Sequence, residues 1–297
     1  MPRSPKLYAT LAILAAVIFW GGSYVSIKAA LTQVSPLDLV AVRLLLAAPT
    51  LALFLVFSRQ RIVPNGGWIL MGAIAVVVFF HFFIMSEGIK ETTASHSAWI
   101  LTVAPLVTVL LAWLWLKERP TWRHWIGMLI ASLGVILLDN TPAVLSTSAV
   151  TSRGNLLVLA TCGTWAVYTI LMKRLTATVS PLVGTFWVTS IAALIFAPFA
   201  LSQGMIDHAA TWSTGVIWHL VYLGVGCLAL AFWFWSEGLR LHSTAESSVF
   251  LYIEPLITVF VAWILLGEIP TGWLWIGALA IALGVQLAES KPKEKRA

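Results

Sequence analysis

Three ionisable residues stand out because each lies inside a long apolar run: Arg43, His81 and Glu254. An ionisable side chain inside a membrane span costs about 2.5–3.5 kcal/mol on insertion scales, so it marks a functional site by default. Glu254 precedes Pro255, and its carboxyl group could bind substrate or carry a proton; a bond to a neighbouring helix is the alternative. His81 could titrate near neutral pH, although a lone histidine among aromatic residues is more often structural. Arg43 could capture a carboxylate, but we favour a structural role, as a helix cap or the partner of a glutamate.

Aromatic side chains away from the expected helix ends form a second group of candidates. Trp20 and Tyr24 are four residues apart and Trp165 and Tyr168 are three apart, so each pair shares a helix face. An aromatic-lined cavity suits a substrate with an apolar side chain or ring, and indole and phenol groups supply hydrogen bonds. Ordinary helix packing is the alternative for each residue. The predicted substrate-binding residues are Trp20, Tyr24, His81, Trp99, Trp165, Tyr168, Tyr252 and Glu254.

Two prolines lie in the middle of expected helices, Pro105 and Pro255. Each removes a backbone donor and frees a carbonyl one turn earlier, near Leu101 and Leu251. Such kinks open a cavity or act as hinges when a transporter changes conformation. They also serve the fold itself, and the sequence does not separate these two roles.

Composition places the chain in a membrane. Of its 297 residues, 60% are hydrophobic and only 10% are charged, whereas a soluble domain carries about 25% charged residues. The formal net charge is +6, but the basic residues sit in short gaps between apolar runs, so we expect no nucleic-acid partner. Cys162 and Cys227 lie inside apolar runs without metal-ligand or disulfide spacing. We therefore expect no metal and no other cofactor.

The apolar runs are long and continuous, which favours helices over alternating barrel strands. The predicted fold is an all-α integral membrane protein with ten transmembrane helices. Their expected bounds are 7–27, 36–57, 68–89, 94–116, 122–139, 154–172, 181–201, 214–236, 244–266 and 272–289. Fourteen Lys and Arg residues fall on the side of the N-terminus and three on the other, which predicts that both termini are cytoplasmic. Residues 290–297 would then form a basic cytoplasmic tail next to the lipid bilayer.

The strongest feature of the sequence is an internal repeat. Residues 86–138 align with 236–288 at a constant offset of 150, without gaps, and 23 of the 53 positions are identical. Earlier parts align at an offset of 145, which pairs Trp20 with Trp165 and Lys28 with Lys173. Each half, 1–140 and 154–289, thus carries five helices, and because five is odd the second half enters the membrane from the opposite side. Such inverted repeats are typical of secondary transporters with a substrate site near the midplane.

The motifs resemble those of the EamA-type branch of the drug/metabolite transporter superfamily. The resemblance rests on Phe19-Trp20-Gly21, on Pro36 followed by Arg43, and on the Pro-Leu-x-Thr and Glu-x-Pro-Thr segments of both halves. One departure is that Arg43 has Val188 as its repeat counterpart, so this signature occurs in the first half alone. The resemblance implies a transporter of the bacterial inner membrane that exports small metabolites, amino acids first of all, by alternating access with or without proton coupling.

Three other functions compete with this interpretation. Multidrug efflux of cationic compounds would also use an aromatic cavity with one acidic residue. A channel would conduct its substrate far faster than a carrier turns over. An intramembrane enzyme would need a catalytic constellation, and the sequence has no His-Glu-x-x-His and no Gly-x-Ser-x-Gly. We therefore expect no enzymatic activity, and the absence of a Gly-x4-Gly-Lys-Ser/Thr loop argues against ATP hydrolysis by this chain.

Overall fold

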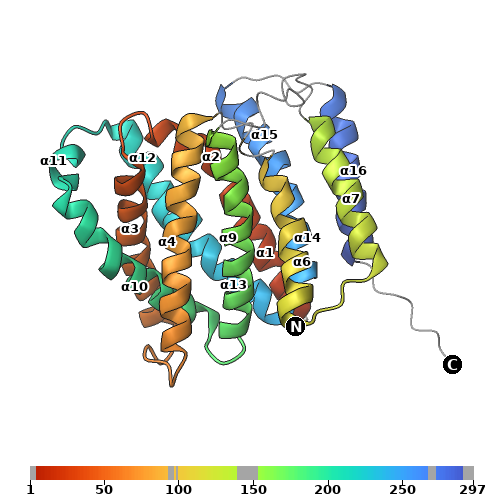
Figure 1. Cartoon of the computed structure of the whole chain (residues 1–297), viewed down its shortest axis with the longest axis horizontal. Coiled ribbons are helices and arrows are strands. Elements are labelled where there is room, and N and C mark those ends of the chain that lie inside the picture. The colour runs from red at the N-terminus through yellow and green to blue at the C-terminus, as the bar shows by residue number, and fades with distance from the viewer. Residues whose placement is uncertain (1–4, 93–96, 98–99, 139–152, 267–271, 290–297) are drawn as a thin grey trace.

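The protein is an all-helical, multi-pass membrane protein, seen here in a computed structural model (Figure 1). The structure describes residues 5–92, 97, 100–138, 153–266 and 272–289, and within these residues every assigned element is a helix. Seven helices are long and apolar enough to span a bilayer, and three shorter apolar helices accompany them, at Leu101–Leu116, Trp122–Leu137 and Trp275–Glu289. The count of ten spans stays a prediction. Trp99, the boundary stretch 140–153 apart from Arg153, and the tail 290–297 lie outside the described residues.

The helices of the first half follow the expected bounds closely, although several consist of two pieces. They are α1 (Pro5–Gly21), α2 (Ser23–Ala30), α3 (Pro36–Ser58), α4 (Trp68–Glu91), η1 (Leu101–Val103), α6 (Ala104–Leu116) and α7 (Trp122–Leu138). The second half contains α9 (Arg153–Leu175), α10 (Pro181–Ser202), α11 (Met205–Ala209), α12 (Thr214–Val221), η3 (Tyr222–Leu230), α13 (Ala231–Leu241), α14 (Thr244–Val249), η4 (Phe250–Ile253), α15 (Glu254–Leu266) and α16 (Gly272–Glu289).

The same Val-Ser-Pro motif starts α3 and α10. Ser35 caps α3 by accepting a hydrogen bond from the backbone amide of Asp38, at 3.1 Å. Ser180 caps α10 in the same way through Val183, at 3.4 Å. Proline follows each serine, at a position where its missing amide hydrogen is not needed. Two equivalent segments of the sequence therefore begin two equivalent helices by one mechanism.

Four helical stretches of the described residues change their geometry along their length. The first breaks at Gly22, between α1 and α2. Two others pass through a 3₁₀ segment, η1 or η4, directly before Pro105 or Pro255. The fourth contains a π-helical segment of nine residues, η3. Interruptions of this kind expose backbone carbonyls inside a membrane protein, and such carbonyls need other donors.

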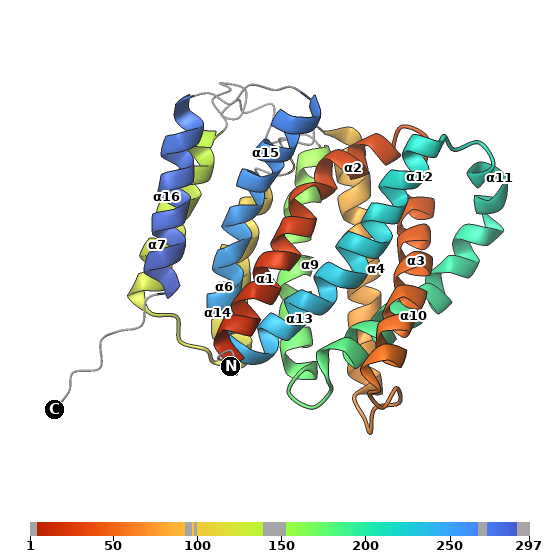
Figure 2. The same ribbon diagram turned by 180° about the vertical axis from the view of Figure 1, so that it is seen from behind.

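The helices pack in pairs that keep their pattern when the two halves are exchanged. α1 packs against α13 and its counterpart α9 packs against α4; likewise α1 contacts α15 and α9 contacts α6. α3 packs against α10, and α7 packs against α16. Figures 1 and 2 show α7 and α16 side by side at one edge of the bundle. Each of these contacts joins one half to the other.

Glycines bring α7 and α16 very close. A Cβ atom on Gly127 would lie 2.4 Å from the carbonyl oxygen of Gly284, and one on Gly134 would lie 2.8 Å from that of Gly277. Gly127 and Gly277 are repeat counterparts, as are Gly134 and Gly284. The two contacts are therefore related by exchanging the halves, and neither helix tolerates a side chain at these positions without moving.

Two lysines at equivalent positions fasten helix ends within each half. The Lys28 ammonium donates to the carbonyls of Ile89 and Thr92 at the end of α4. Lys173 donates to the carbonyls of Leu239 and His242 at the end of α13. The acceptors are again 150 residues apart. A cation at a helix C-terminus satisfies free carbonyls and interacts favourably with the helix dipole.

Candidate functional site

A cavity lies between the two halves and receives side chains from both. Its volume, counted out to its open side, is about 680 Å³. Its lining consists of Trp20, Ser23, Tyr24, Arg43, His81, Phe82, Met85, Leu101, Thr102, Ala104, Trp165, Phe232, Leu251, Glu254 and Pro255. Most of these side chains are apolar or aromatic, and three are ionisable. That composition is typical of a small-molecule site.

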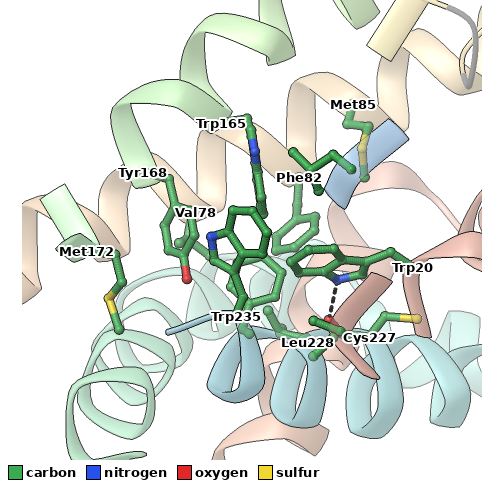
Figure 3. Close-up of a cluster of buried hydrophobic side chains, with 14 of the residues drawn as sticks. Trp20, Val78, Phe82, Met85, Trp165, Tyr168, Met172, Cys227, Leu228 and Trp235 are labelled. Atoms are coloured by element: carbon green, nitrogen blue, oxygen red, sulfur yellow. Dashed lines mark hydrogen bonds between the residues drawn. The ribbon is translucent and has the colours of Figure 1, made fainter. Parts of the chain in front are cut away.

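Two pairs of repeat-equivalent aromatic residues meet at this cavity. The rings of Trp20 and Trp165 contact each other edge to face, with centroids 5.1 Å apart and planes at 89°. Phe82 and Phe232, which are 150 residues apart, lie with centroids at 5.5 Å. Figure 3 shows Trp20, Trp165 and Trp235 converging from different helices, and Trp235 lies 5.5 Å from each of the other two. The result is a continuous aromatic wall.

The interruption in the eighth predicted span orients Trp20. The indole nitrogen of Trp20 donates to the carbonyl of Cys227 at 3.0 Å, the dashed contact in Figure 3. Cys227 lies in the π-helical segment, where the wider turn leaves carbonyls free to accept such bonds. Tyr222, from the same segment, donates its hydroxyl to the carbonyl of Phe19. Side chains next to each interruption thus donate hydrogen bonds to backbone carbonyls of the other.

Glu254 is the acidic residue of the cavity. It is the first residue of α15, directly before Pro255, and its carboxyl group interacts with the hydroxyl of Tyr24. Thr258, one turn later, donates to the carbonyl of Gly21 at 2.6 Å and so joins α15 to the break in the first span. The structure therefore places Glu254 and Tyr24 together at the cavity, as carboxyl and phenol groups from opposite halves.

Arg43 projects from α3 into the same cavity and is only 2% exposed. Its guanidinium carbon lies 4.0 Å from the centroid of the Phe82 ring, in a cation–π contact. The nitrogens Nε and Nη1 are buried without a hydrogen-bond partner. The glutamate partner that we favoured from the sequence is not found in the described part of the chain, where no ion pair includes Arg43.

His81 also reaches the cavity but has a structural hydrogen bond. Its Nδ1 lies 2.9 Å from the hydroxyl oxygen of Thr164, which itself donates to the carbonyl of Thr161. The ring lies 5.7 Å from Trp165. His81 thus positions the aromatic wall and presents one ring edge to the cavity.

Other predicted site residues lie elsewhere. Tyr168 is behind the wall, 5.3 Å from the Trp165 ring. Tyr252 is fully buried and accepts a hydrogen bond from Ser132 of α7 at 3.0 Å, so it joins η4 to α7 and does not line the cavity. Pro105 is buried in α6 outside the cavity, whereas Pro255 lines it.

Sequence reasoning missed several lining residues, Phe82 and Phe232 above all. A signal for them exists, because extending the 150-residue alignment four positions upstream of Ser86 pairs these two phenylalanines. Ser23, Met85 and Thr102 also line the cavity, without a sequence feature that distinguishes them from packing residues. Within the described residues, no group of three His, Cys, Asp or Glu side chains could hold a metal ion.

Comparison with known proteins gives the same family for both halves. The sequence model of the EamA-like transporter family matches residues 7–138 and again residues 152–288. An uncharacterised transporter of Archaeoglobus fulgidus is 26% identical over 279 residues, covering 93% of this chain and 95% of its own length. A probable terminal-alkyne amino-acid exporter of Streptantibioticus cattleyicolor is 28% identical over 294 residues, covering 97% and 95%. A solved crystal structure superposes with a TM-score of 0.79 at 19% identity, covering 96% of this chain and 97% of the other, a likeness in fold alone.

Proposed function

The chain belongs to the EamA-like transporter family, and from this premise we propose that it is a secondary transporter that exports small metabolites. Its preferred substrates are amino acids with aromatic or other apolar side chains. The observation that carries this proposal is the cavity between the halves, with its wall of Trp20, Trp165, Phe82 and Phe232 and the carboxyl group of Glu254 beside it. An aromatic wall binds the side chain, and a carboxylate binds the ammonium group.

The proposed mechanism is alternating access of two inverted five-helix repeats, residues 1–140 and 154–289. The helix contacts support this arrangement: α1 packs against α13, and their counterparts in the other half, α9 and α4, pack against each other. The 3₁₀ segments before Pro105 and Pro255 are matched hinges in this scheme. We place ten spans in the bacterial inner membrane with both termini cytoplasmic, on the distribution of Lys and Arg.

The amino-acid class draws support from one relative, the probable terminal-alkyne amino-acid exporter. A second candidate function is efflux of cationic compounds. It is favoured by the same carboxyl group against aromatic faces, since these attract a cation without requiring anything else of the substrate. Proton coupling through Glu254 is compatible with either substrate class, because a carboxyl group inside a membrane span can exchange a proton for a cationic substrate.

The test is transport by purified protein in liposomes. Saturable uptake of labelled L-phenylalanine, inhibited by other apolar amino acids and not by glycine or aspartate, is the expected result. Empty liposomes and liposomes with the Trp165→Ala variant serve as controls. Uptake of a labelled quaternary ammonium compound without uptake of any amino acid would replace amino-acid export by cation efflux. A flux far above about 10³ substrate molecules per second through each protein would indicate a channel, because typical turnover numbers lie below that rate.

A further inference from the structure

We infer that Arg43 is the subsite for the substrate's carboxylate, which restricts this transporter to anionic or zwitterionic ligands. The inference rests on the proposed function and adds a ligand class to it. Its starting point is a buried cation without an ion-pair partner among the described residues: the Arg43 side chain is 2% exposed, and Nε and Nη1 lack hydrogen-bond partners there. A charged group in a low-dielectric interior requires a partner, because burial without one is strongly unfavourable.

In the described part of the chain, no carboxylate forms an ion pair with Arg43. Glu254 shares the cavity with Arg43, and no ion pair of the described residues joins the two. Five other carboxylates have partners elsewhere: Asp38 with His208, Glu91 with Arg153, Glu118 with Thr244, Glu237 with Arg240 and Glu246 with His242. Because no ion pair among the described residues includes Arg43, we assign its counterion to a bound molecule.

The surroundings of Arg43 favour a planar anion. Phe82 covers one face of the guanidinium at 4.0 Å, so the donor groups along its edges remain for a ligand. A guanidinium edge matches a carboxylate through two parallel hydrogen bonds, which a lysine ammonium cannot reproduce. The equivalent position of the second half is Val188, which is buried and apolar. One carboxylate site per chain is the consequence.

Arg43 and Glu254 give the cavity two separate poles of opposite charge. A zwitterionic amino acid would place its carboxylate at Arg43 and its ammonium group at Glu254 and Tyr24. Its side chain would then lie along Trp20 and Trp165. A cation without a carboxylate would leave Arg43 unpaired and would add a second positive charge to the cavity. The same geometry thus selects amino acids over the cationic compounds of the rival function.

Four related ligands test Arg43 and Glu254 separately, because they differ in carrying a carboxylate, an ammonium group or both. They are L-phenylalanine, L-phenylalaninamide, phenethylamine and 3-phenylpropionate. Binding is measured by thermal stabilisation of the purified protein, and transport by inhibition of phenylalanine uptake. In the wild type, phenylalanine should bind more tightly than the amide or the amine, by about tenfold to hundredfold for one charged, bidentate interaction. Arg43→Gln should weaken the binding of phenylalanine and 3-phenylpropionate by that factor, and it should leave the binding of phenethylamine no weaker, because a positive charge is removed from the cavity. Glu254→Gln should weaken the binding of phenylalanine and phenethylamine, and it should leave the binding of 3-phenylpropionate no weaker, because a negative charge is removed from the cavity.

Two further variants distinguish recognition from structure. Arg43→Lys keeps the positive charge but loses the two parallel hydrogen-bond donors of the guanidinium edge. It should therefore retain only part of the wild-type affinity for phenylalanine. Arg43→Met should leave the ligand-free protein at least as heat-stable as the wild type, because it removes a buried cation without a partner. If Arg43 held the fold together, its replacement by methionine would lower the melting temperature instead. Arg240→Gln, which breaks an ion pair outside the cavity, is the matched control for loss of an arginine.

The outcomes separate the inference from the function on which it rests. Unchanged phenylalanine affinity in Arg43→Gln, with transport intact, would overturn the carboxylate subsite and leave amino-acid transport standing. Equal binding of the amino acid and its amide by the wild type would overturn it too. No binding of any of the four ligands by folded wild-type protein would contradict the proposed substrate class, and the inference with it.

Discussion

Trp20 and Trp165 occupy the same position in the two halves of the chain, and their rings meet edge to face with centroids 5.1 Å apart. Phe82 and Phe232 are a second pair of counterparts that meet in this way, with ring centroids 5.5 Å apart. The aromatic wall therefore lies where both halves of the transporter contribute equally. Any relative movement of the halves must change the contact between these two rings.

Trp165→Ala should raise the KM for an aromatic substrate by about tenfold. The substitution removes a ring that contacts Trp20, Phe232 and Trp235, and such aromatic contacts contribute about 0.5–1.5 kcal/mol each beyond their buried area. Trp165→Phe should retain most of the affinity. Trp218→Ala, at a position 67% exposed on the outside of α12, is the control. Equal KM values for the two alanine variants would remove Trp165 from the site.

Glu254→Gln should abolish proton-driven accumulation if Glu254 carries the coupled proton. Wild-type vesicles with an imposed pH gradient should accumulate substrate above its equilibrium distribution, and the variant should only equilibrate it, because glutamine cannot exchange a proton. The readout is accumulation with and without a protonophore. Accumulation that persists in the variant would assign coupling to another group.

Gly127→Ala should destabilise the protein by about 1–3 kcal/mol, the usual range for overpacking a core. The added Cβ would lie 2.4 Å from the carbonyl oxygen of Gly284, where only a separation of α7 and α16 gives room. Gly72→Ala is the matched control, since nothing lies within 4 Å of its Cβ position. Thermal unfolding in detergent compares the two. A stable Gly127→Ala protein would mean that this edge of the bundle is loosely packed.

Lys28→Met and Lys173→Met should each lower stability by about 1–3 kcal/mol, because buried carbonyls lose a charged donor. The two variants should have similar effects, since their acceptors are equivalent helix ends. Hydrogen exchange would locate the loosened segment at the end of α4 for the first and of α13 for the second. Lys90→Met, with an exposed side chain, controls for loss of charge.

Pro105→Ala and Pro255→Ala should slow turnover more than they weaken binding. Each restores a backbone amide at the start of α6 or α15 and allows the preceding 3₁₀ segment to continue as an α-helix. Pro198→Ala, inside α10 on an exposed face, is the control for loss of a helical proline. A fall in kcat with a nearly constant KM would support the hinge role; unchanged kcat would make both prolines purely structural.

Sequence alone predicted the regular parts of this fold. Apolar runs predicted the bounds of α3 and α10 to within a residue, at 36–58 and 181–202. It did not predict the break at Gly22 or the π-helix around Cys227, because each depends on donors and acceptors of the other. A helical interruption stabilised by a distant residue has no local signature.

The candidate site was predictable in type and not in detail. Ionisable residues in apolar runs led to Arg43, His81 and Glu254, since the membrane makes such residues costly. Tyr252 looked equally suitable, yet its ring turns toward Ser132, and the direction of a side chain depends on the rotation of its helix. The role that we favoured for Arg43 depended on a partner that only the packed structure can reveal.

The π-helical segment and Arg43 both lack a counterpart in the other half: Thr214–Leu241 has 28 residues where α4 has 24. A scaffold with identical halves would be equally stable facing either side of the membrane, and would bind its ligand equally well on both. These two departures, and others such as Glu254 at the position matched by Ala104, make the halves unequal. Under the proposed alternating access, one resting orientation would be the more populated, and the affinity for the ligand would differ between the two faces by a linked factor. The preferred direction of transport would then depend on the positions at which the two halves differ.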